Sequence, residues 1–431
     1  MRSIHKVVVL GANGTMGSGA GAVFDAAGVP TVLLARTAER AAAGMARAEQ
    51  LAKGRIAPHV LACGTYDECS PALRDADFIL EAVAEDLATK RDVLALVDRL
   101  RGPTAVVATV SSGLSIAELC AGRSDDFRAH FLGAHLFNPP TVIAGCELIV
   151  HAGTAPDVLA VVRDFLTGTC GREVIECADK PAFAGNRLGF KVLNEVAQLA
   201  EAHGVAYVDY LIGPHTGRAL PPLATIDLVG WDVHKAIVDN VHARTRDTAR
   251  ATFALPAYMQ RGIDRGHLGR KTRDKGGFYR LEKSGGTTQH FVLDPRTGDY
   301  RPLAEVAPPS STLVEMMKAA GHPGAMQVLC TATGLEADLL RRVLLGYISY
   351  GLGLVGEVVE RPRDIDRIMG FGFHWAPPSV LVDAIGAART IAMLEQLQLP
   401  VPQPILDAAR HQRPLFNEAA IDTGRFFVAA A

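Results

Sequence analysis

Three glycines directly after the first apolar run constrain the fold of this chain more than any other feature. The run Val7–Leu10 is typical of a buried strand, and a helical pattern then extends as far as Ala27. The glycines between them are Gly11, Gly14 and Gly17. Residues without a Cβ allow a tight strand-to-helix turn, and the unpaired N–H groups of a helix N-terminus attract a pyrophosphate. The sequence therefore predicts a dinucleotide-binding loop near the start of the chain.

The spacing of this loop departs from the common G-x-G-x-x-G pattern by one residue. Asn13 is the insertion, so the glycines recur at every third position. A glycine pattern alone is a weak signal, but its place after the first strand and before a helix strengthens it. The residues expected to contact a dinucleotide here are Gly11, Gly14, Thr15, Met16 and Gly17.

Apolar runs and helical patterns alternate over residues 1–182. This alternation favours a mainly parallel α/β sheet of the doubly wound Rossmann type. Ser115 and Glu118 have the spacing of a capping box and predict the start of a helix. Further strands are expected at Thr31–Leu34, His59–Cys63, Phe78–Ala82, Ala105–Thr109, Phe131–His135 and Leu148–His151.

After about Asp179 the pattern becomes helical, except for a Gly- and Thr-rich segment that predicts a hairpin turning at residues 296–298. One series of residues occurs twice in this part: Asp209, Pro221-Pro222 and Asp227, then Asp366, Pro377-Pro378 and Asp383. The shared order favours a duplicated helical domain. The predicted domains are residues 1–182, a first helical domain 183–285, a hairpin and linker 286–310, and a second helical domain 311–431.

Composition excludes several classes of function. The 431 residues include 44 basic and 46 acidic side chains, a net charge of −2, so the basic excess of a nucleic-acid-binding protein is absent. No apolar run approaches the ~20 residues of a membrane span, and the N-terminus shows no signal-peptide pattern. The seven cysteines are scattered without metal-ligand spacing. We therefore expect a cytoplasmic protein with reduced thiols and no metal site.

The end of the second expected strand bears on which dinucleotide binds. An NAD enzyme usually carries a carboxylate there, which accepts hydrogen bonds from the ribose diol. This chain has Ala35 and Arg36 instead. Loss of the carboxylate removes repulsion against a 2′-phosphate, and the guanidinium could pair with that phosphate. An exposed arginine without a ligand is the alternative, so the sequence leaves NAD and NADP both open.

His135 and Glu147 form a candidate acid/base pair. His135 lies at the carboxyl end of an expected strand, where doubly wound sheets place their sites, and Glu147 directly precedes another apolar run. A carboxylate that holds one tautomer of an imidazole creates a general base. An isolated histidine in this position is more often structural, so the pair needs further support.

That support comes from a family resemblance. The chain resembles the L-3-hydroxyacyl-CoA dehydrogenases of fatty-acid β-oxidation over nearly its whole length. The hairpin and second helical region are most similar to the dehydrogenase half of bacterial multifunctional β-oxidation enzymes, which implies a 6-phosphogluconate-dehydrogenase-like helical region. The motifs that carry the resemblance are Gly11–Gly19, Glu81–Glu85 with Lys90, Ser112–Ser115, His135–Pro139 with Glu147, Asp179–Arg187, Gly269–Thr272 and Gly276–Tyr279.

The resemblance implies roles for these residues. His135 would take the proton of the substrate 3-hydroxyl as hydride leaves for a nicotinamide, and Glu147 would orient the imidazole. Ser112 and Asn186 would hydrogen-bond the reacting oxygen. The resemblance also implies that Glu85 and Lys90 contact the cofactor. Asn138 would either contact the substrate or support the turn before Pro139.

Two departures from the family concern the substrate. Val110 replaces an asparagine that normally helps to hold the nicotinamide and the thioester. The long basic helical arm that grips CoA is reduced to one short helix within residues 37–58, whose cations are Arg40, Arg47, Lys53 and Arg55. Acyl-CoA is therefore the leading substrate class, followed by a carrier-bound thioester and a free 3-hydroxy acid.

Two alternative functions remain open. The β-hydroxyacid dehydrogenases use a catalytic lysine in a K-x-x-N helix, and this chain has Lys191 and Asn194 at that spacing. A non-catalytic relative that only binds nucleotide is the other alternative, which the altered loop and Val110 favour. The duplicated domain could supply internally a contact that relatives make between subunits, so we expect a monomer or a homodimer.

Overall fold

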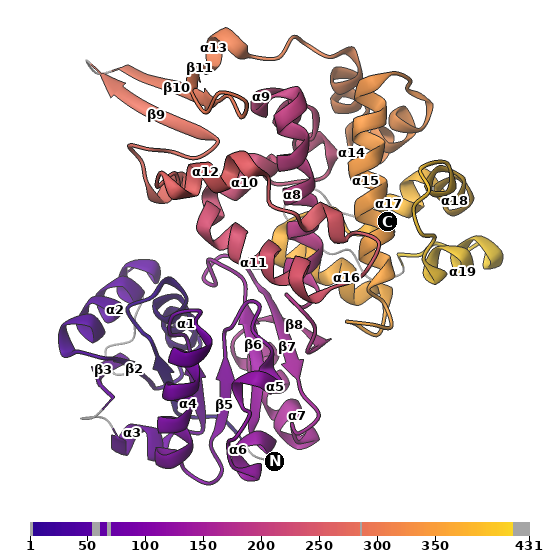
Figure 1. The fold of residues 1–431 in the computed structure, drawn as a ribbon. Coiled ribbons are helices and arrows are strands. Elements are labelled where there is room, and N and C mark those ends of the chain that lie inside the picture. The colour runs from indigo at the N-terminus through magenta and orange to yellow at the C-terminus, as the bar shows by residue number, and fades with distance from the viewer. Residues whose placement is uncertain (1–2, 54–60, 67–69, 285–286, 417–431) are drawn as a thin grey trace. The chain divides into compact units, whose positions relative to one another are not determined.

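The computed structural model describes residues 3–53, 61–66, 70–284 and 287–416. The chain divides into two compact units, Met1–Phe183 and Ala184–Ala431. Figure 1 shows the helices and strands of both units.

The first unit is built on one eight-stranded sheet. Its strand order is β3-β2-β1-β4-β5-β6-β7-β8, and every neighbouring pair is parallel except β6 and β7. The first six strands thus have the order of a Rossmann fold, as the sequence predicts. The strands are β1 Val7–Leu10, β2 Thr31–Ala35, β3 Leu61–Thr65, β4 Phe78–Glu81, β5 Val106–Thr109, β6 Phe131–Leu136, β7 Gly145–Val150 and β8 Glu173–Ala178.

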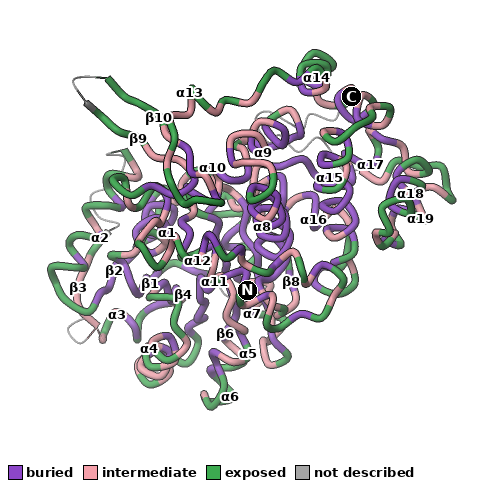
Figure 2. Tube along the Cα trace, turned by 45° about the horizontal axis from the view of Figure 1, so that its top comes forward, coloured by how far each residue is buried: buried purple, intermediate pink, exposed green. Residues whose placement is uncertain are grey.

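The central strands are buried on both faces, which is why they read as continuous apolar runs. All four residues of β1, β4 and β5 are buried, and Figure 2 shows β1 and β4 in purple. The helices of this unit are α1 Thr15–Ala26, α2 Ala38–Leu51, α3 Ser70–Asp75, α4 Leu87–Leu100, α5 Ile116–Leu119, α6 Asp125–Ala129 and α7 Pro156–Asp164.

Several local predictions are confirmed. Helix α1 ends with Ala27 as its C-cap, and Gly28 follows with a φ of +74°. Ser115 caps α5 by accepting a hydrogen bond from the Glu118 N–H. The strand expected to begin at His59 is β3, which starts at Leu61, while His59 itself lies outside the described residues.

The sequence reading missed β8 and the reversed direction of β7. Strand β8 alternates buried with more exposed positions, among them the exposed Glu176, so it lacks the continuous apolar run of the inner strands. Strand β7 is antiparallel to β6 because only a short connection, residues 137–144, joins them. A parallel pair would need a longer crossover.

The second unit is mainly helical and is centred on α8 (Gly185–His203), whose residues are mostly buried. Helix α8 packs against α9, α10, α11 and α15. Among the described residues, no helix combines the length and apolar character needed to cross a membrane. The other helices are α9 Val205–Leu211, α10 Pro222–Val229, α11 Trp231–Arg244, α12 Ala257–Asp264, α13 Leu303–Val306, α14 Thr312–Thr331, α15 Leu335–Gly353, α16 Pro362–Ile368, α17 Pro378–Ile385, α18 Ala387–Gln396 and α19 Gln403–His411.

A three-stranded antiparallel sheet interrupts these helices, with the order β11-β10-β9. Its strands are β9 Tyr279–Ser284, β10 Thr287–Leu293 and β11 Tyr300–Pro302. The predicted turn at residues 296–298 lies between β10 and β11, but β9 was not predicted. The sheet begins before residue 286, where the sequence analysis places the start of the linker.

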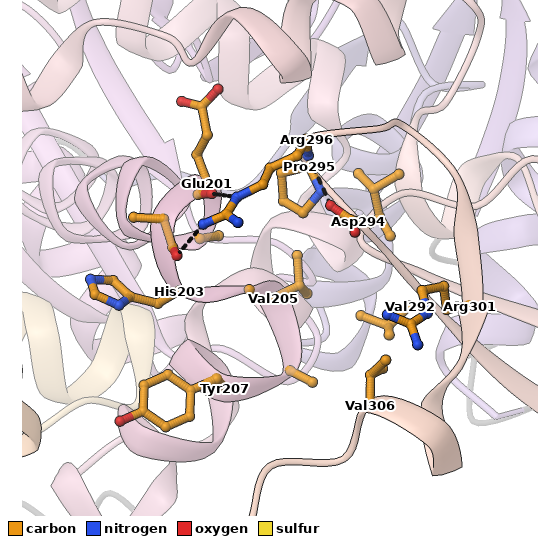
Figure 3. Close-up of a pocket in the computed structure, with 15 residues that line it drawn as sticks. Glu201, His203, Val205, Tyr207, Val292, Asp294, Pro295, Arg296, Arg301 and Val306 are labelled. Carbon is orange, nitrogen blue, oxygen red and sulfur yellow. Dashed lines mark hydrogen bonds between the residues drawn. The ribbon is translucent and has the colours of Figure 1, made fainter.

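The turn of this sheet docks on the C-terminal end of α8. The Arg296 guanidinium donates hydrogen bonds to the carbonyl oxygens of Glu201 (3.1 Å) and Ala202 (2.7 Å), as Figure 3 shows. The last carbonyls of a helix have no partner within the helix, and a cation there also opposes the helix dipole. Arg296 therefore attaches the sheet to α8.

The two series of aspartates predicted from the repeat make matching contacts. Asp209 accepts a hydrogen bond from the backbone N–H of Leu223, the residue after Pro222, and Asp366 accepts one from Ser379, the residue after Pro378. Each of the second aspartates accepts two consecutive backbone N–H groups: Asp227 from Phe278 and Tyr279, and Asp383 from Leu415 and Phe416. These contacts support the predicted duplication of the helical domain.

Candidate active site

The loop between β1 and α1 is so close to neighbouring backbone that side chains at its glycines would clash. Gly11 has a φ of +80°, and a Cβ there would lie 2.5 Å from the Ala82 oxygen. A Cβ on Gly17 would lie 2.4 Å from the Gly11 oxygen. Gly14 caps α1 without a side-chain hydrogen bond, and its N–H closes a turn onto the Gly11 oxygen at 3.0 Å. The inserted Asn13 is exposed and leaves this turn closed, so the residues present fit a pyrophosphate.

The end of β2 has the composition that the sequence indicates. Ala35 is buried and Arg36 is exposed. Thr37 caps α2 and accepts a hydrogen bond from the Arg40 N–H. Arg40, Arg47 and Lys53 are exposed on or just after this helix, and Arg55 lies outside the described residues. A flexible cation at the end of β2 is therefore available to a ligand of the glycine loop.

Tyr66 is a residue of this region that the sequence analysis missed. Burial raises the pKa of the Tyr66 phenol above its usual value, whereas a hydrogen bond with the Gly11 backbone and the nearby Arg36 act in the opposite direction. The phenol thus lies against the first glycine of the loop. An aromatic residue shortly after the third strand carries no local pattern that marks it as part of a dinucleotide site.

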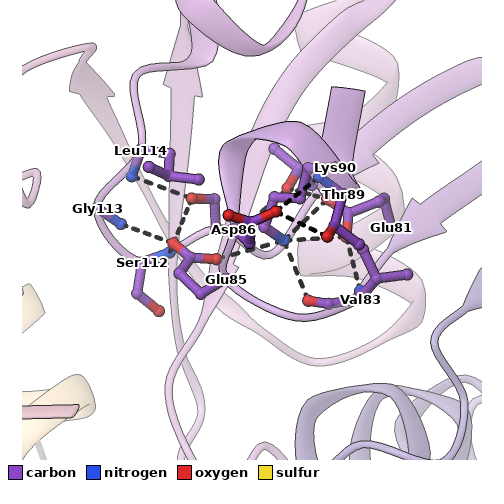
Figure 4. Close-up of polar contacts among 11 residues, drawn as sticks. Glu81, Val83, Glu85, Asp86, Thr89, Lys90, Ser112, Gly113 and Leu114 are labelled. Atoms are coloured by element: carbon purple, nitrogen blue, oxygen red, sulfur yellow. Dashed lines mark hydrogen bonds and ion pairs between the residues drawn. The ribbon is translucent and has the colours of Figure 1, made fainter. Parts of the chain in front are cut away.

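Lys90 and Glu81 form a buried ion pair beneath the ends of β4 and β5. Both side chains are fully buried, and the ammonium lies 2.9 and 3.0 Å from the two carboxylate oxygens. The Thr109 hydroxyl donates to Glu81 at 2.6 Å, and the Lys90 ammonium also reaches the Val83 oxygen at 3.3 Å. Figure 4 shows these contacts. The structure therefore gives Lys90 a supporting position inside the fold.

Glu85 connects this ion pair to the loop after β5. Its carboxylate lies 3.3 Å from the Lys90 ammonium. The same carboxylate accepts hydrogen bonds from the Ser111 hydroxyl at 2.6 Å, the Ser112 N–H at 2.8 Å and the Gly113 N–H at 3.3 Å (Figure 4). Charge-assisted hydrogen bonds of this kind are stronger than neutral ones, so Glu85 fixes the backbone that carries Ser112.

Asp179 fixes the other end of the same loop. Its carboxylate accepts hydrogen bonds from the Ser115 hydroxyl at 2.8 Å and from the N–H groups of Ile116 at 3.0 Å and Ala117 at 2.9 Å. The first N–H groups of α5 therefore have a negatively charged partner, which the helix dipole favours.

His135 and Glu147 lie directly opposite each other on β6 and β7. The His135 Nδ1 is 2.7 Å from Glu147 Oε2; Glu147 is fully buried, and only 4% of His135 is exposed. An ionised carboxylate can only accept, so Nδ1 carries the proton and Nε2 presents a lone pair when the ring is neutral. Glu147 thus selects the tautomer that can act as a base.

The surroundings of this pair restrict the imidazole further. The His135 ring meets Phe137 edge-on at 4.9 Å and Phe183 at 5.8 Å between ring centres. On the other side, the buried Cys177 of β8 donates its S–H to Glu147 Oε1 at 3.6 Å. Each oxygen of the carboxylate therefore has its own donor. Cys177 was missed because β8 was missed.

The remaining predicted site residues lie as follows. Asn138 is exposed, and its peptide bond to Pro139 is cis. Ser112 is partly buried in the loop that Glu85 holds. Asn186 is 6% exposed and belongs to the first turn of α8, in the second unit. The structure thus brings together Glu85 with Ser112 and His135 with Glu147, while a joint action of Asn186 with them stays a prediction. Within the described parts of the chain, no group of three or more metal-ligating side chains gathers.

Family models match both units of the chain. Residues 6–180 match the model of the 3-hydroxyacyl-CoA dehydrogenase NAD binding domain, and residues 183–280 match that of the 3-hydroxyacyl-CoA dehydrogenase C-terminal domain. A probable 3-hydroxyacyl-CoA dehydrogenase of Bacillus subtilis is 31% identical over 93% of this chain, which spans 53% of that protein's length. Another of Deinococcus radiodurans is 31% identical over 72% of this chain and 92% of its own length.

Among solved structures, a 3-hydroxybutyryl-CoA dehydrogenase from Escherichia coli K12 superposes with a TM-score of 0.66. The match covers 95% of this chain and 99% of that one at 19% identity. At this identity the match concerns the fold alone, and it extends over the second helical region.

Proposed function

The chain belongs to the 3-hydroxyacyl-CoA dehydrogenase family, and from this premise we propose that it interconverts a 3-hydroxyacyl-CoA and the corresponding 3-oxoacyl-CoA. The observation that carries the proposal is the buried His135–Glu147 pair on the sheet that also bears the glycine loop. Its chemistry is that of a general base with an orienting carboxylate, which oxidation of a secondary alcohol requires.

The cofactor is NAD, which would accept the hydride from C3 of the substrate. In the direction of alcohol oxidation, His135 Nε2 would remove the proton of the 3-hydroxyl, and the imidazole would become positively charged. Glu147 faces that charge at 2.7 Å in a buried site, where the interaction is stronger than in water. In the reverse direction the imidazolium returns the proton to the 3-oxo oxygen.

Ser112 and Asn186 are proposed to hydrogen-bond the reacting oxygen. For Ser112 the support is the set of hydrogen bonds that the Ser111 hydroxyl and the Ser112 N–H donate to Glu85, which fix its backbone. For Asn186 it is a place in the first turn of a buried helix, where a side chain has little freedom. Glu85 would also contact the cofactor, and Lys90 would act through Glu81 and Glu85 because its own ammonium is buried.

Use of NADP in addition to NAD is part of the proposal. Ala35 leaves no carboxylate at the end of β2 that would repel a 2′-phosphate, and the exposed Arg36 could pair with one. Asn13 lengthens the neighbouring loop without opening its turn. A preference for NADH that Arg36→Ala leaves unchanged would refute this part.

The rival role of Lys191 as a catalytic residue has less support. Its ammonium is bound to Glu195 at 2.8 Å, and the Asn194 amide donates to the backbone oxygens of Thr252 and Ala254. In this environment Asn194 joins backbone segments, and His135 and Glu147 would be left without a function. A free 3-hydroxy acid or a carrier-bound thioester remains the second choice of substrate, because the helix after β2 carries only a few cations.

A single assay tests the proposed function. Purified chain is supplied with acetoacetyl-CoA or a longer 3-ketoacyl-CoA, and with NADH or NADPH, and the loss of absorbance of the reduced nicotinamide is followed. We expect turnover of at least one thioester. Tight binding of NADH without turnover of any 3-ketoacyl substrate would favour the non-catalytic alternative.

We also propose that the second helical region makes internally the contact that relatives make between subunits. Its support is the packing of α15 against α8 within one chain. Light scattering should then give the mass of a monomer, or of a dimer that uses another surface. A dimer abolished by substitutions on α8 would count against it.

A further inference from the structure

A cavity of about 1,100 Å³ lies in the second unit, and its lining includes Arg187, the neighbour of Asn186, and Lys191, the residue of the rival catalytic role. It is bounded by α8, by α15, by residues 247–252 and by residues 397–400. Ligand sites commonly measure ~300–1,000 Å³, so the space is large enough for an organic molecule. The small cavity beside the Arg296 turn measures only about 260 Å³.

The floor of the cavity is made by two facing stripes of side chains on α8 and α15. Successive members are four residues apart on each helix, and the helices run in opposite directions. The facing pairs are Arg187 with Tyr350, Lys191 with Gly346, and Glu195 with Arg342. A Cβ on Gly346 would lie 2.6 Å from the Lys191 Nζ, so the missing side chain leaves room for the ammonium.

At one end of this floor, the positive charge of Arg187 already has carboxylate partners. The Arg187 guanidinium donates to the Tyr350 hydroxyl at 2.8 Å, to Glu357 at 2.7 Å and to Asp247 at 2.8 Å. Tyr350 in turn donates to Asp247. Arg187 therefore has fixed partners, and the two carboxylates would repel an additional anion at this end.

The other end carries an excess of positive charge. Lys191 bonds one oxygen of Glu195 at 2.8 Å, and the Arg342 Nε bonds the other at 3.2 Å. Two cations thus share one carboxylate, because the other carboxylate lining this end, Asp338, is paired with Arg341 at 3.4 Å and is largely exposed. The Lys191 side chain is only 5% exposed, yet among the described residues its three-donor ammonium makes this single hydrogen bond. Buried donors without acceptors are costly, so oxygen atoms of a ligand or of water are needed there.

The walls of the cavity carry leucine side chains among polar ones such as Thr248, Thr252 and Gln398. Leu339 lies one helical turn from Arg342 on α15, and Leu354 directly follows the end of that helix. Leu397, Leu399 and Pro400 come from the segment after α18. The cavity therefore combines a cationic region around Lys191 and Arg342 with several leucine side chains.

We propose that this cavity is a second ligand site, which binds a monocarboxylate with an apolar chain. The carboxylate would bridge the Lys191 ammonium and the Nη groups of Arg342, and the chain would lie along the leucines. One net positive charge matches one carboxylate, whereas Asp247 and Glu357 at the far end disfavour a multivalent phosphate. This site goes beyond the proposed dehydrogenase function and does not depend on it.

Octanoate is the probe, titrated into the full chain by isothermal calorimetry at low salt. We expect one octanoate to bind saturably. 1-Octanol should bind with lower affinity, because it lacks the negative charge. Arg342→Gln should weaken the binding about tenfold or more, since a charge-assisted bond is lost, whereas Arg410→Gln on the exposed face of α19 should leave it unchanged. Lys191→Met should abolish it.

The outcomes separate the possibilities clearly. Absence of saturable heat, equal binding of octanol and octanoate, or an Arg342→Gln affinity equal to that of the native chain would each overturn the proposal. Arg342 is half-exposed, so this variant is expected to fold even if Lys191→Met does not. His135→Gln should keep full octanoate affinity, which distinguishes this site from a failure of the proposed catalytic function.

Discussion

Glu147 holds His135 from the directly opposite position on the neighbouring strand, with 2.7 Å between Oε2 and Nδ1. Both side chains are buried, and both are carried by strands of one sheet, which is more rigid than a loop. The tautomer of the imidazole is thus determined by the register of β6 and β7.

His135→Gln should lower kcat for reduction of a 3-ketoacyl-CoA by about 10²–10⁴-fold, because the proton donor is lost. Glu147→Gln should cause a smaller loss, since the imidazole stays but its tautomer and charge lose their support. Steady-state kinetics with NADH measures both. Unchanged NADH affinity is the control that the Rossmann unit remains folded, and near-native kcat in His135→Gln would refute the assignment.

Cys177→Ala should lower kcat by roughly three- to tenfold, because Glu147 Oε1 loses its donor and no larger side chain is introduced. Cys177→Ser should retain most of the activity, since a hydroxyl also donates. The comparison of these two variants isolates the hydrogen bond from packing. If both behave alike, the thiol contributes only its volume.

Lys90→Met should destabilise the first unit by about 3–5 kcal/mol, because it leaves the buried Glu81 carboxylate without its cation. Lys271→Met is the matched control: its pair with Asp232 is 41% and 45% exposed, so about 0–1 kcal/mol is expected. Urea denaturation of the three proteins gives the comparison. Equal losses in the two variants would contradict the burial argument.

Arg36→Ala should reduce kcat/KM for NADPH by about tenfold and change that for NADH little, because only NADPH places a phosphate at the end of β2. Arg47→Ala, an exposed cation on α2, provides the control. A parallel fall for both cofactors would indicate that Arg36 contacts a group that they share.

His234 should make the second unit sensitive to acid. Burial lowers the pKa of His234 to about 3 from a usual value of 6.5, and its Nε2 bonds Asn194 at 2.9 Å. The neutral form is favoured in the folded state, so this contribution to stability is complete above pH 6.5. It is lost as the pH falls towards 3, at about 1.4 kcal/mol per pH unit.

His234→Gln keeps a donor towards Asn194 and cannot titrate. Its free energy of unfolding should therefore fall less steeply between pH 6.5 and 3 than that of the native chain, while His411→Gln at the exposed end of α19 should follow the native curve. Urea midpoints at several pH values measure the slopes. Identical slopes for all three proteins would exclude a role of His234.

Local sequence signals were sufficient for many single elements. The glycine loop, the inner strands, the cap at Ser115 and the turn between β10 and β11 were all predicted, because each depends on residues close together in the chain. The candidate pair His135 and Glu147 was found in the same way, from a spacing of twelve residues between adjacent strands.

Other features depended on contacts between distant segments. Glu85 meets residues 111–113, Tyr66 meets Gly11, and Cys177 reaches Glu147 across thirty positions of sequence. Each of these side chains would serve equally well as an ordinary surface or core residue. Their partners are specified by the order and register of the strands that carry them.

The sequence by itself determined the class of fold and the chemistry available to the site, because periodicity and residue type act locally. Only the tertiary structure decided which donor meets which acceptor: the burial of Lys90 between two carboxylates, the two donors on Glu147, and the shared Glu195 of Lys191 and Arg342. The physical reason is that a hydrogen bond or ion pair depends on distance and direction to within a fraction of an ångström, and these are set by packing between elements far apart in the chain.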